Sequence, residues 1–123
     1  MLLKNFYTVL TSESLEAHSF GATVRINKEH PIFEGHFPNF PVTPGVTMLQ
    51  IIKELTENQL NQSLFLSSAS NVKFISLVDP NVNAILKFNI TFQEDDQHIK
   101  VKNTTSFEDG TAVLKCNVTF VKR

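Results

Sequence analysis

Residues 43–61, with the sequence TPGVTMLQIIKELTENQLN, carry the one long helical pattern of the 123-residue chain. Thr43 can cap this helix, and Pro44 suits its first position, where a missing N–H leaves no hydrogen bond unmade. Apolar residues recur along one arc: Met48, Leu49, Ile51, Ile52 and Leu55. The opposite arc is polar: Gln50, Lys53, Glu54, Glu57, Asn58 and Asn61. The pattern predicts an amphipathic helix that starts within two residues of Pro44 and ends near Asn61.

Outside this helix, apolar residues alternate with a period of two, which is typical of half-buried strands. Such stretches cover residues 17–27, 72–78, 82–92, 99–107 and 112–120. Polar turns at 93–97 and 108–110 join the last three strands into a meander. A long antiparallel sheet and a single helix bury their apolar faces only if the sheet wraps the helix. The sequence therefore predicts a single α+β domain over residues 1–123, with a central helix inside a curved sheet.

Two further segments flank the first strand. The first ten residues place Leu2, Leu3, Phe6, Tyr7 and Leu10 at helical spacing, which predicts a short amphipathic helix. Residues 29–44 contain four prolines and one glycine, so regular structure is not expected there. This segment is too apolar for disorder, and long irregular segments in small domains are usually functional.

Composition excludes several functional classes. The formal charge is −1 without a basic block, which argues against nucleic-acid binding. No apolar run approaches the roughly 20 residues that span a bilayer, and the N-terminus lacks a signal-peptide pattern, so a soluble cytoplasmic protein is expected. The only cysteine, Cys116, follows a strand pattern and is predicted to lie in the core. The four histidines lack metal-ligand spacing, so neither a metal nor a cofactor is expected.

The proline-rich segment carries a specific motif. Residues 33–38 read FEGHFP and residues 41–46 read PVTPGV. This resembles the G-H-F-P-x-x-P-v-x-P-G-V signature of the 3-hydroxyacyl-acyl-carrier-protein dehydratases. The resemblance continues in V-K-F-x-x-x-V-x-P over residues 72–80 and in the final turn and strand over residues 109–120. It implies a hot-dog fold, with active sites at the interface of a homodimer or higher homo-oligomer.

Dehydration of a 3-hydroxyacyl thioester needs a base for the proton beside the carbonyl and a donor for the developing oxyanion. By resemblance, His36 is the base. Gly45 lies in the first turn of the helix, where backbone N–H groups have no intrahelical partner. The resemblance assigns its amide to the thioester carbonyl. A purely steric role for Gly45 at the helix entry is the alternative.

Gln50 departs from the family pattern. The second catalytic residue of the family, a Glu or Asp, stands five residues after the helix-opening glycine, at position 50 here. A glutamine amide can orient a hydroxyl or a water but cannot give up a proton at neutral pH. The loss leaves a slow dehydratase or a protein that only binds. Glu54, one turn further, is a candidate substitute acid, but a solvated polar face is the stronger interpretation of Gln50, Glu54 and Glu57.

The sequence predicts a dehydratase acting on a thioester of acyl carrier protein or coenzyme A. A non-catalytic acyl-thioester-binding subunit and a hot-dog thioesterase remain as alternatives. Near the motif, the candidate substrate-binding residues are Phe37, Pro44, Val46, Met48 and Phe74. Lys73 is a candidate contact for an acidic carrier protein, although a solvent-facing lysine is the stronger interpretation. No nucleic acid or membrane is expected as a partner.

Overall fold

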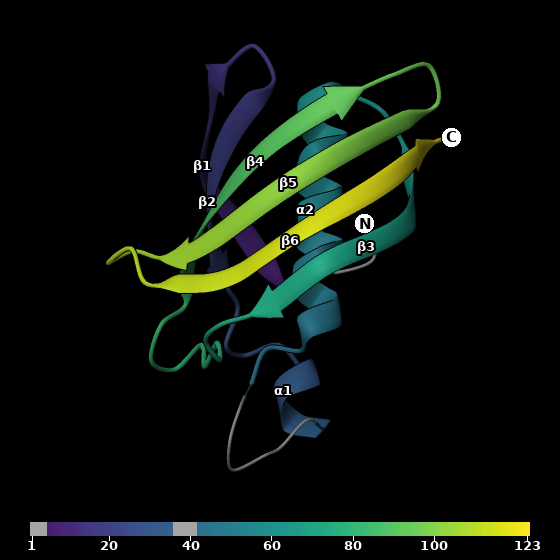
Figure 1. The fold of residues 1–123 in the computed structure, drawn as a ribbon. Helices are drawn as coiled ribbons and strands as arrows, with labels where there is room; N and C mark the ends of the chain where they lie inside the picture. The colour runs from purple at the N-terminus through teal and green to yellow at the C-terminus, as the bar shows by residue number, and fades with distance from the viewer. Residues whose placement is uncertain (1–4, 36–41) are drawn as a thin grey trace.

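The computed structural model describes residues 5–35 and 42–123. Within them, six strands form one antiparallel sheet in the order β1-β2-β4-β5-β6-β3. The strands are β1 (Tyr7–Glu16), β2 (Ser19–Ile26), β3 (Leu64–Phe74), β4 (Ile85–Glu94), β5 (His98–Phe107) and β6 (Ala112–Lys122). The sheet curves around the long helix α2 (Gly45–Leu60), as Figure 1 shows. This confirms the predicted α+β hot-dog fold.

Helix α2 has the predicted bounds but not the predicted cap. Pro44 occupies the N-cap position and makes no side-chain capping bond. The Thr43 hydroxyl is buried and has no hydrogen-bond partner among the described residues, so the capping role predicted for Thr43 is wrong. The Thr47 hydroxyl instead donates to the Pro44 carbonyl over 2.6 Å. The helix ends at Leu60, and its C-cap residue Asn61 has a left-handed backbone and donates its N–H to the Glu57 carbonyl.

The N-terminal region differs from the prediction. Tyr7 and the residues up to Glu16 form β1, so the short helix expected over the first ten residues is wrong where the structure describes it. Strand β1 pairs along β2, with Tyr7 opposite Ile26 and Val9 opposite Val24. Edge pairing in the sheet overrides the local helical spacing of these residues. Residues 1–4 lie outside the described part of the chain.

Two other elements depart from the sequence pattern. Residues Ile32–Gly35 form the short helix α1, within the segment expected to be irregular. Its Phe33 is buried and stacks on Phe6 with ring centroids 5.8 Å apart. Strand β3 ends at Phe74 and begins at Leu64, eight residues earlier than the strand predicted over 72–78. The other four predicted stretches correspond to β2, β4, β5 and β6.

The core lies between α2 and the inner face of the sheet. From α2 it takes Met48, Ile51, Ile52 and Leu55, of which both isoleucines are completely buried. Cys116 on β6 is also buried, as predicted, and burial raises the pKa of its thiol to about 11. No helix among the described residues is long and apolar enough to span a membrane.

Candidate functional site

The N-terminus of α2 lies under an aromatic ring. A β-carbon on Gly45 would lie 2.6 Å from Cζ of Phe74 and 3.1 Å from both of its Cε atoms. Phe74 ends β3, and the structure therefore brings together two residues that the sequence analysis singled out separately. The ring is 53% exposed, so it covers the helix entry from the solvent side. Gly45 thus has a steric reason to be glycine, and this reason is compatible with a role for its amide.

The other predicted binding residues fall in different surroundings. Met48 is 2% exposed and belongs to the core, whereas Val46 is 73% exposed. Pro44 is half-buried at the helix start. His36 and Phe37 lie outside the described residues, so their roles stay predictions. The described chain resumes at Val42, two residues before the N-cap of α2.

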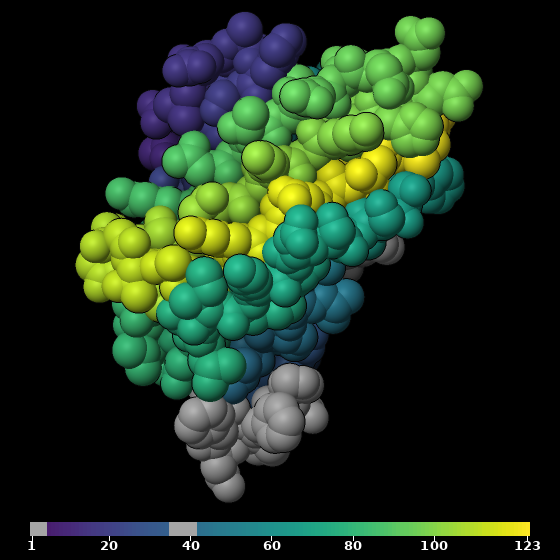
Figure 2. All heavy atoms as spheres, viewed as in Figure 1, coloured from purple at the N-terminus to yellow at the C-terminus, as the bar shows by residue number. Residues whose placement is uncertain are grey.

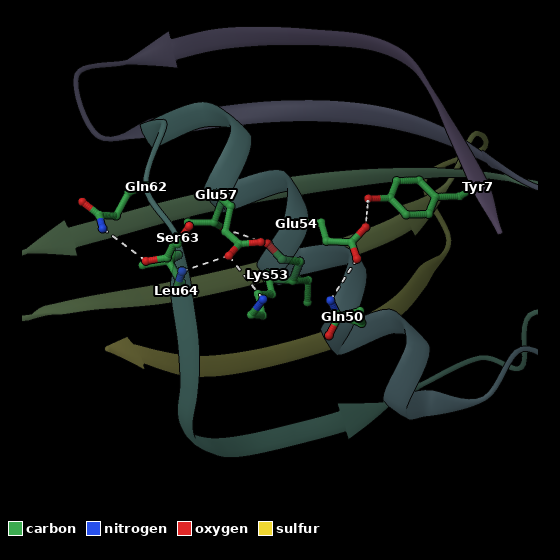
Figure 3. A network of polar contacts seen from close by, with 10 residues as sticks. Tyr7, Gln50, Lys53, Glu54, Glu57, Gln62, Ser63 and Leu64 are labelled. Atoms are coloured by element: carbon green, nitrogen blue, oxygen red, sulfur yellow. Dashed lines mark hydrogen bonds and ion pairs between the residues drawn. The ribbon is translucent and has the colours of Figure 1, made fainter. Parts of the chain in front are cut away.

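Gln50 is the end of a buried hydrogen-bond chain (Figure 3). Its Nε2 donates to Oε2 of Glu54 over 2.9 Å. The hydroxyl of Tyr7 on β1 donates to the other oxygen of Glu54, Oε1, over 2.7 Å. Glu54 is only 4% exposed, so the prediction that it sits on a solvated polar face is wrong. Tyr7 on β1 lies against the side of α2 that carries Glu54. The spacing of polar and apolar residues along α2 carries no information about a neighbouring strand.

Tyr7 is the residue of this cluster that sequence reasoning missed. Burial, together with the hydrogen bond to the Glu54 carboxylate, raises the pKa of Tyr7 far above its ordinary value. The phenol therefore stays protonated and acts as a donor. Among the described residues, no salt bridge joins Glu54 to a cation. The nearby Lys53 pairs with Glu57 over 3.2 Å. A buried carboxylate held by neutral donors alone is costly, so the hydrogen bonds from Tyr7 and Gln50 are needed to keep Glu54 buried.

A polar groove of about 530 Å³ extends from this cluster along α2. Gln50 and Glu54 line one part of it, and Asn61, Gln62 and Arg123 line another. Glu57 lies between these parts, where it also accepts a hydrogen bond from the backbone N–H of Leu64 over 2.9 Å. Figure 3 shows Gln50, Glu54 and Glu57 along one side of the helix. Gln50 thus lies where a buried polar cluster meets an open groove.

Comparison with known families identifies one match over most of the chain. The model of the ApeI-like family, described as ApeI dehydratase, matches residues 12–113. The 3-hydroxyacyl-[acyl-carrier-protein] dehydratase FabZ of Lactobacillus helveticus is 26% identical over 98% of this chain and 87% of that protein. The FabZ of Lawsonia intracellularis is 31% identical over 72% of this chain and 67% of that protein.

Solved structures share the fold. The dehydratase heterocomplex ApeI:P from Xenorhabdus doucetiae superposes with a TM-score of 0.75 and 19% identity, over 93% of this chain and 96% of that one. A hypothetical thioesterase from Streptococcus pneumoniae TIGR4, solved with coenzyme A, gives a TM-score of 0.67 at 9% identity, over 95% and 85% of the two chains. At these identities the likeness concerns the hot-dog fold alone.

The contact between Gly45 and Phe74 makes a testable prediction. Gly45→Ala should lower the free energy of unfolding by roughly 1 kcal/mol or less, because the new methyl group overlaps the Phe74 ring and the half-exposed ring must move aside. The loss should be much smaller in a Phe74→Ala background. Gly21→Ala is the matched control, since its β-carbon would meet nothing closer than 3.7 Å. Urea unfolding of the four variants and the wild type measures these differences, and equal losses in both backgrounds would contradict the contact.

The single tyrosine of the chain makes the buried cluster directly observable. The pKa of Tyr7 is raised in the folded protein, so its contribution to stability is complete below the ordinary value of 10.0 and is lost as the pH rises above it. Tyrosinate absorbance should therefore stay low above pH 10 until the protein unfolds. The urea-unfolded chain is the control and should ionise near the ordinary value. Ionisation of the folded protein at that same pH would exclude the buried hydrogen bond.

Proposed function

Because the chain belongs to the ApeI-like dehydratase family, we propose that it eliminates water from a 3-hydroxyacyl thioester to give the 2-enoyl thioester. The observation that carries this proposal is the family match over residues 12–113, which includes the proline-rich motif and α2. The FabZ relatives, named as 3-hydroxyacyl-[acyl-carrier-protein] dehydratases, support the same reaction. Gly45 stands at the first residue of α2, where such a site needs an oxyanion donor.

In the proposed elimination, His36, Gly45 and Gln50 each have a separate role. His36 removes the proton from C2, the C3–O bond breaks, and the C2–C3 double bond forms. The proton held by His36 then passes to the departing hydroxyl, which leaves as water. The amide of Gly45 donates to the thioester oxygen while negative charge develops there. The roles of His36 and Gly45 rest on the resemblance, and Gln50 contacts the hydroxyl without supplying a proton.

The exposed edge of the sheet supports a homodimer. Among the described residues, strand β3 pairs with β6 alone, and in Figure 2 its teal atoms lie at the edge of the sheet beside the yellow atoms of β6. Exposed apolar side chains gather on β3 and just after it: Phe65, Leu66, Phe74, Ile75 and Leu77. Unpaired edges with apolar side chains associate readily. The resemblance implies that, in such a dimer, His36 of one subunit lies nearer to Gln50 of the other subunit than to its own.

Two lysines support a carrier protein as the source of the thioester. Lys73 on β3 and Lys115 on β6 are register partners, and both are exposed. Like charges placed opposite each other destabilise a sheet, and an anionic partner offsets that repulsion. Lys73 directly precedes Phe74, which covers the helix entry. An acidic carrier docked here, or the phosphates of coenzyme A, would present its thioester beside Gly45.

Binding of an acyl thioester without turnover is the second candidate. The observation that favours it is Gln50, which replaces the expected acid at the site. A positioned acid contributes roughly 10²–10⁴ in rate, so its loss can leave binding intact with little turnover.

A direct assay separates the two candidates. Purified protein mixed with a 3-hydroxyacyl carrier thioester should develop enoyl absorbance, and His36→Ala should abolish the signal. Gln50→Glu should raise the rate by roughly tenfold or more, because a carboxylic acid can transfer a proton and an amide cannot. The new carboxyl would lie against Glu54, so the pair would retain a proton near neutral pH. Thioester binding without any enoyl product in the wild type would favour the second candidate.

Association through β3 is tested with two leucines of equal exposure. Light scattering at micromolar concentration should give twice the chain mass of 13.9 kDa. Leu66→Lys on β3 should weaken the dimer, because it places a charge on the apolar edge. Leu15→Lys is the control on the opposite edge strand β1, since both leucines are 48% exposed. A monomeric wild type, or equal effects of both substitutions, would exclude this interface.

A further inference from the structure

We propose that Glu54 is the positioning residue for Gln50: it fixes the Gln50 amide so that Oε1 faces the substrate and accepts a hydrogen bond from its 3-hydroxyl group. This inference rests on the proposed dehydration and concerns the same site. The buried Glu54 carboxylate lies one helical turn after Gln50, the residue proposed to contact substrate, and holds the Gln50 side chain in position. In this arrangement the amide oxygen of Gln50 accepts a hydrogen bond from the substrate hydroxyl. The sequence alone does not decide whether the oxygen or the nitrogen of the amide meets the substrate.

The orientation of the amide follows from its partner. A glutamine side chain has one end that donates and one that accepts, whereas an ionised carboxylate only accepts. The end that meets Oε2 of Glu54 at 2.9 Å must therefore be Nε2. The opposite end, Oε1, is then left to face the groove that Gln50 lines. A neutral partner at position 54 would permit either orientation of the amide.

Glu54 is itself held in place. Tyr7 donates to its Oε1 over 2.7 Å, so each carboxylate oxygen accepts one protein hydrogen bond. Glu54 and Tyr7 are 4% and 8% exposed, and they connect α2 to β1. Gln50 is half-buried and lies nearer the helix start. Both carboxylate oxygens of Glu54 are thus engaged by the protein, and Glu54 acts on the reaction through Gln50.

An acceptor at position 50 suits a single-base elimination. If Gln50 Oε1 holds the hydrogen of the 3-hydroxyl, the lone pairs of the hydroxyl oxygen are turned away from Gln50. They are then free to receive the C2 proton that His36 carries. The carboxylate behind the amide strengthens the acceptor, because linked hydrogen bonds polarise one another. No additional acid is required for the atoms and protons of the reaction to balance.

A double-mutant cycle tests whether Glu54 acts through Gln50. Glu54→Gln should lower kcat roughly 10- to 100-fold with little change in KM, since the substitution releases the orientation of the amide. In a Gln50→Ala background the same substitution should have no further effect on kcat. An undiminished kcat in Glu54→Gln, or an equal loss in both backgrounds, would overturn the proposal.

Glu94→Gln is the control, because it makes the same chemical change at a carboxylate outside the groove that Gln50 lines. The Glu94 carboxylate pairs with Lys122 on β6 over 2.6 Å, so its substitution should leave kcat unchanged. The exchange variant Gln50→Glu/Glu54→Gln provides a rescue. In this variant the side-chain amide at position 54 would donate to the carboxylate at position 50. The Tyr7 hydroxyl could still donate to the amide oxygen at position 54. This variant should recover at least the wild-type kcat, and failure to exceed Glu54→Gln alone would count against the pairing.

A readout independent of turnover separates this inference from the proposed function. The side-chain amide resonances of Gln50, assigned by their loss in Gln50→Ala, should shift in Glu54→Gln and in Tyr7→Phe but not in Glu94→Gln. Unshifted resonances in Glu54→Gln would overturn the inference even in an active enzyme. A wild type with shifted resonances in Glu54→Gln but no enoyl product would instead refute the dehydration.

Discussion

Burial of one face of α2 inside the curved sheet is the constraint on which the rest of the structure depends. Ile51 and Ile52 are completely buried, and Leu55 is nearly so. Full burial of one such side chain contributes about 1.5–3 kcal/mol, so turning the helix about its axis would be strongly unfavourable. The direction of Gly45, Gln50 and Glu54 is thereby fixed. The site inherits its geometry from the packing of the helix on which it is built.

The sequence predicts those elements whose burial is periodic. Strands β2, β4, β5 and β6 alternate buried and exposed residues, and α2 has one apolar arc, so local spacing identifies each of them. The two edge strands behave differently. Strand β3 is exposed over most of its length, so its first residues show no alternation. At the start of β1, the spacing of Phe6, Tyr7 and Leu10 is that of a helix. Pairing with β2 makes the residues from Tyr7 onward a strand.

The residues of the candidate site differ in the same way: some can be recognised from the local sequence, and others only from long-range contacts. Gly45 and Phe74 could be singled out from their motifs, but their contact joins the start of α2 to the end of an edge strand. Glu54 was expected to be solvated because its neighbours on the helix are polar. Its burial depends on β1, and the donor Tyr7 lies 47 residues away in the sequence. Contacts of that range leave no trace in local periodicity.

The order of strands also constrains how the site forms during synthesis of the chain. Strand β3 pairs with β6, and β2 pairs with β4, so both pairings join strands that are distant in the sequence. Such non-local pairings form late and slowly. Until β2 and β4 pair and hold β1 in place, the Glu54 carboxylate can stay hydrated, because its burial depends on β1 and Tyr7. Assembly of the site is therefore coupled to non-local pairings of the sheet, and a chain in which they do not form would carry the motif residues without their arrangement.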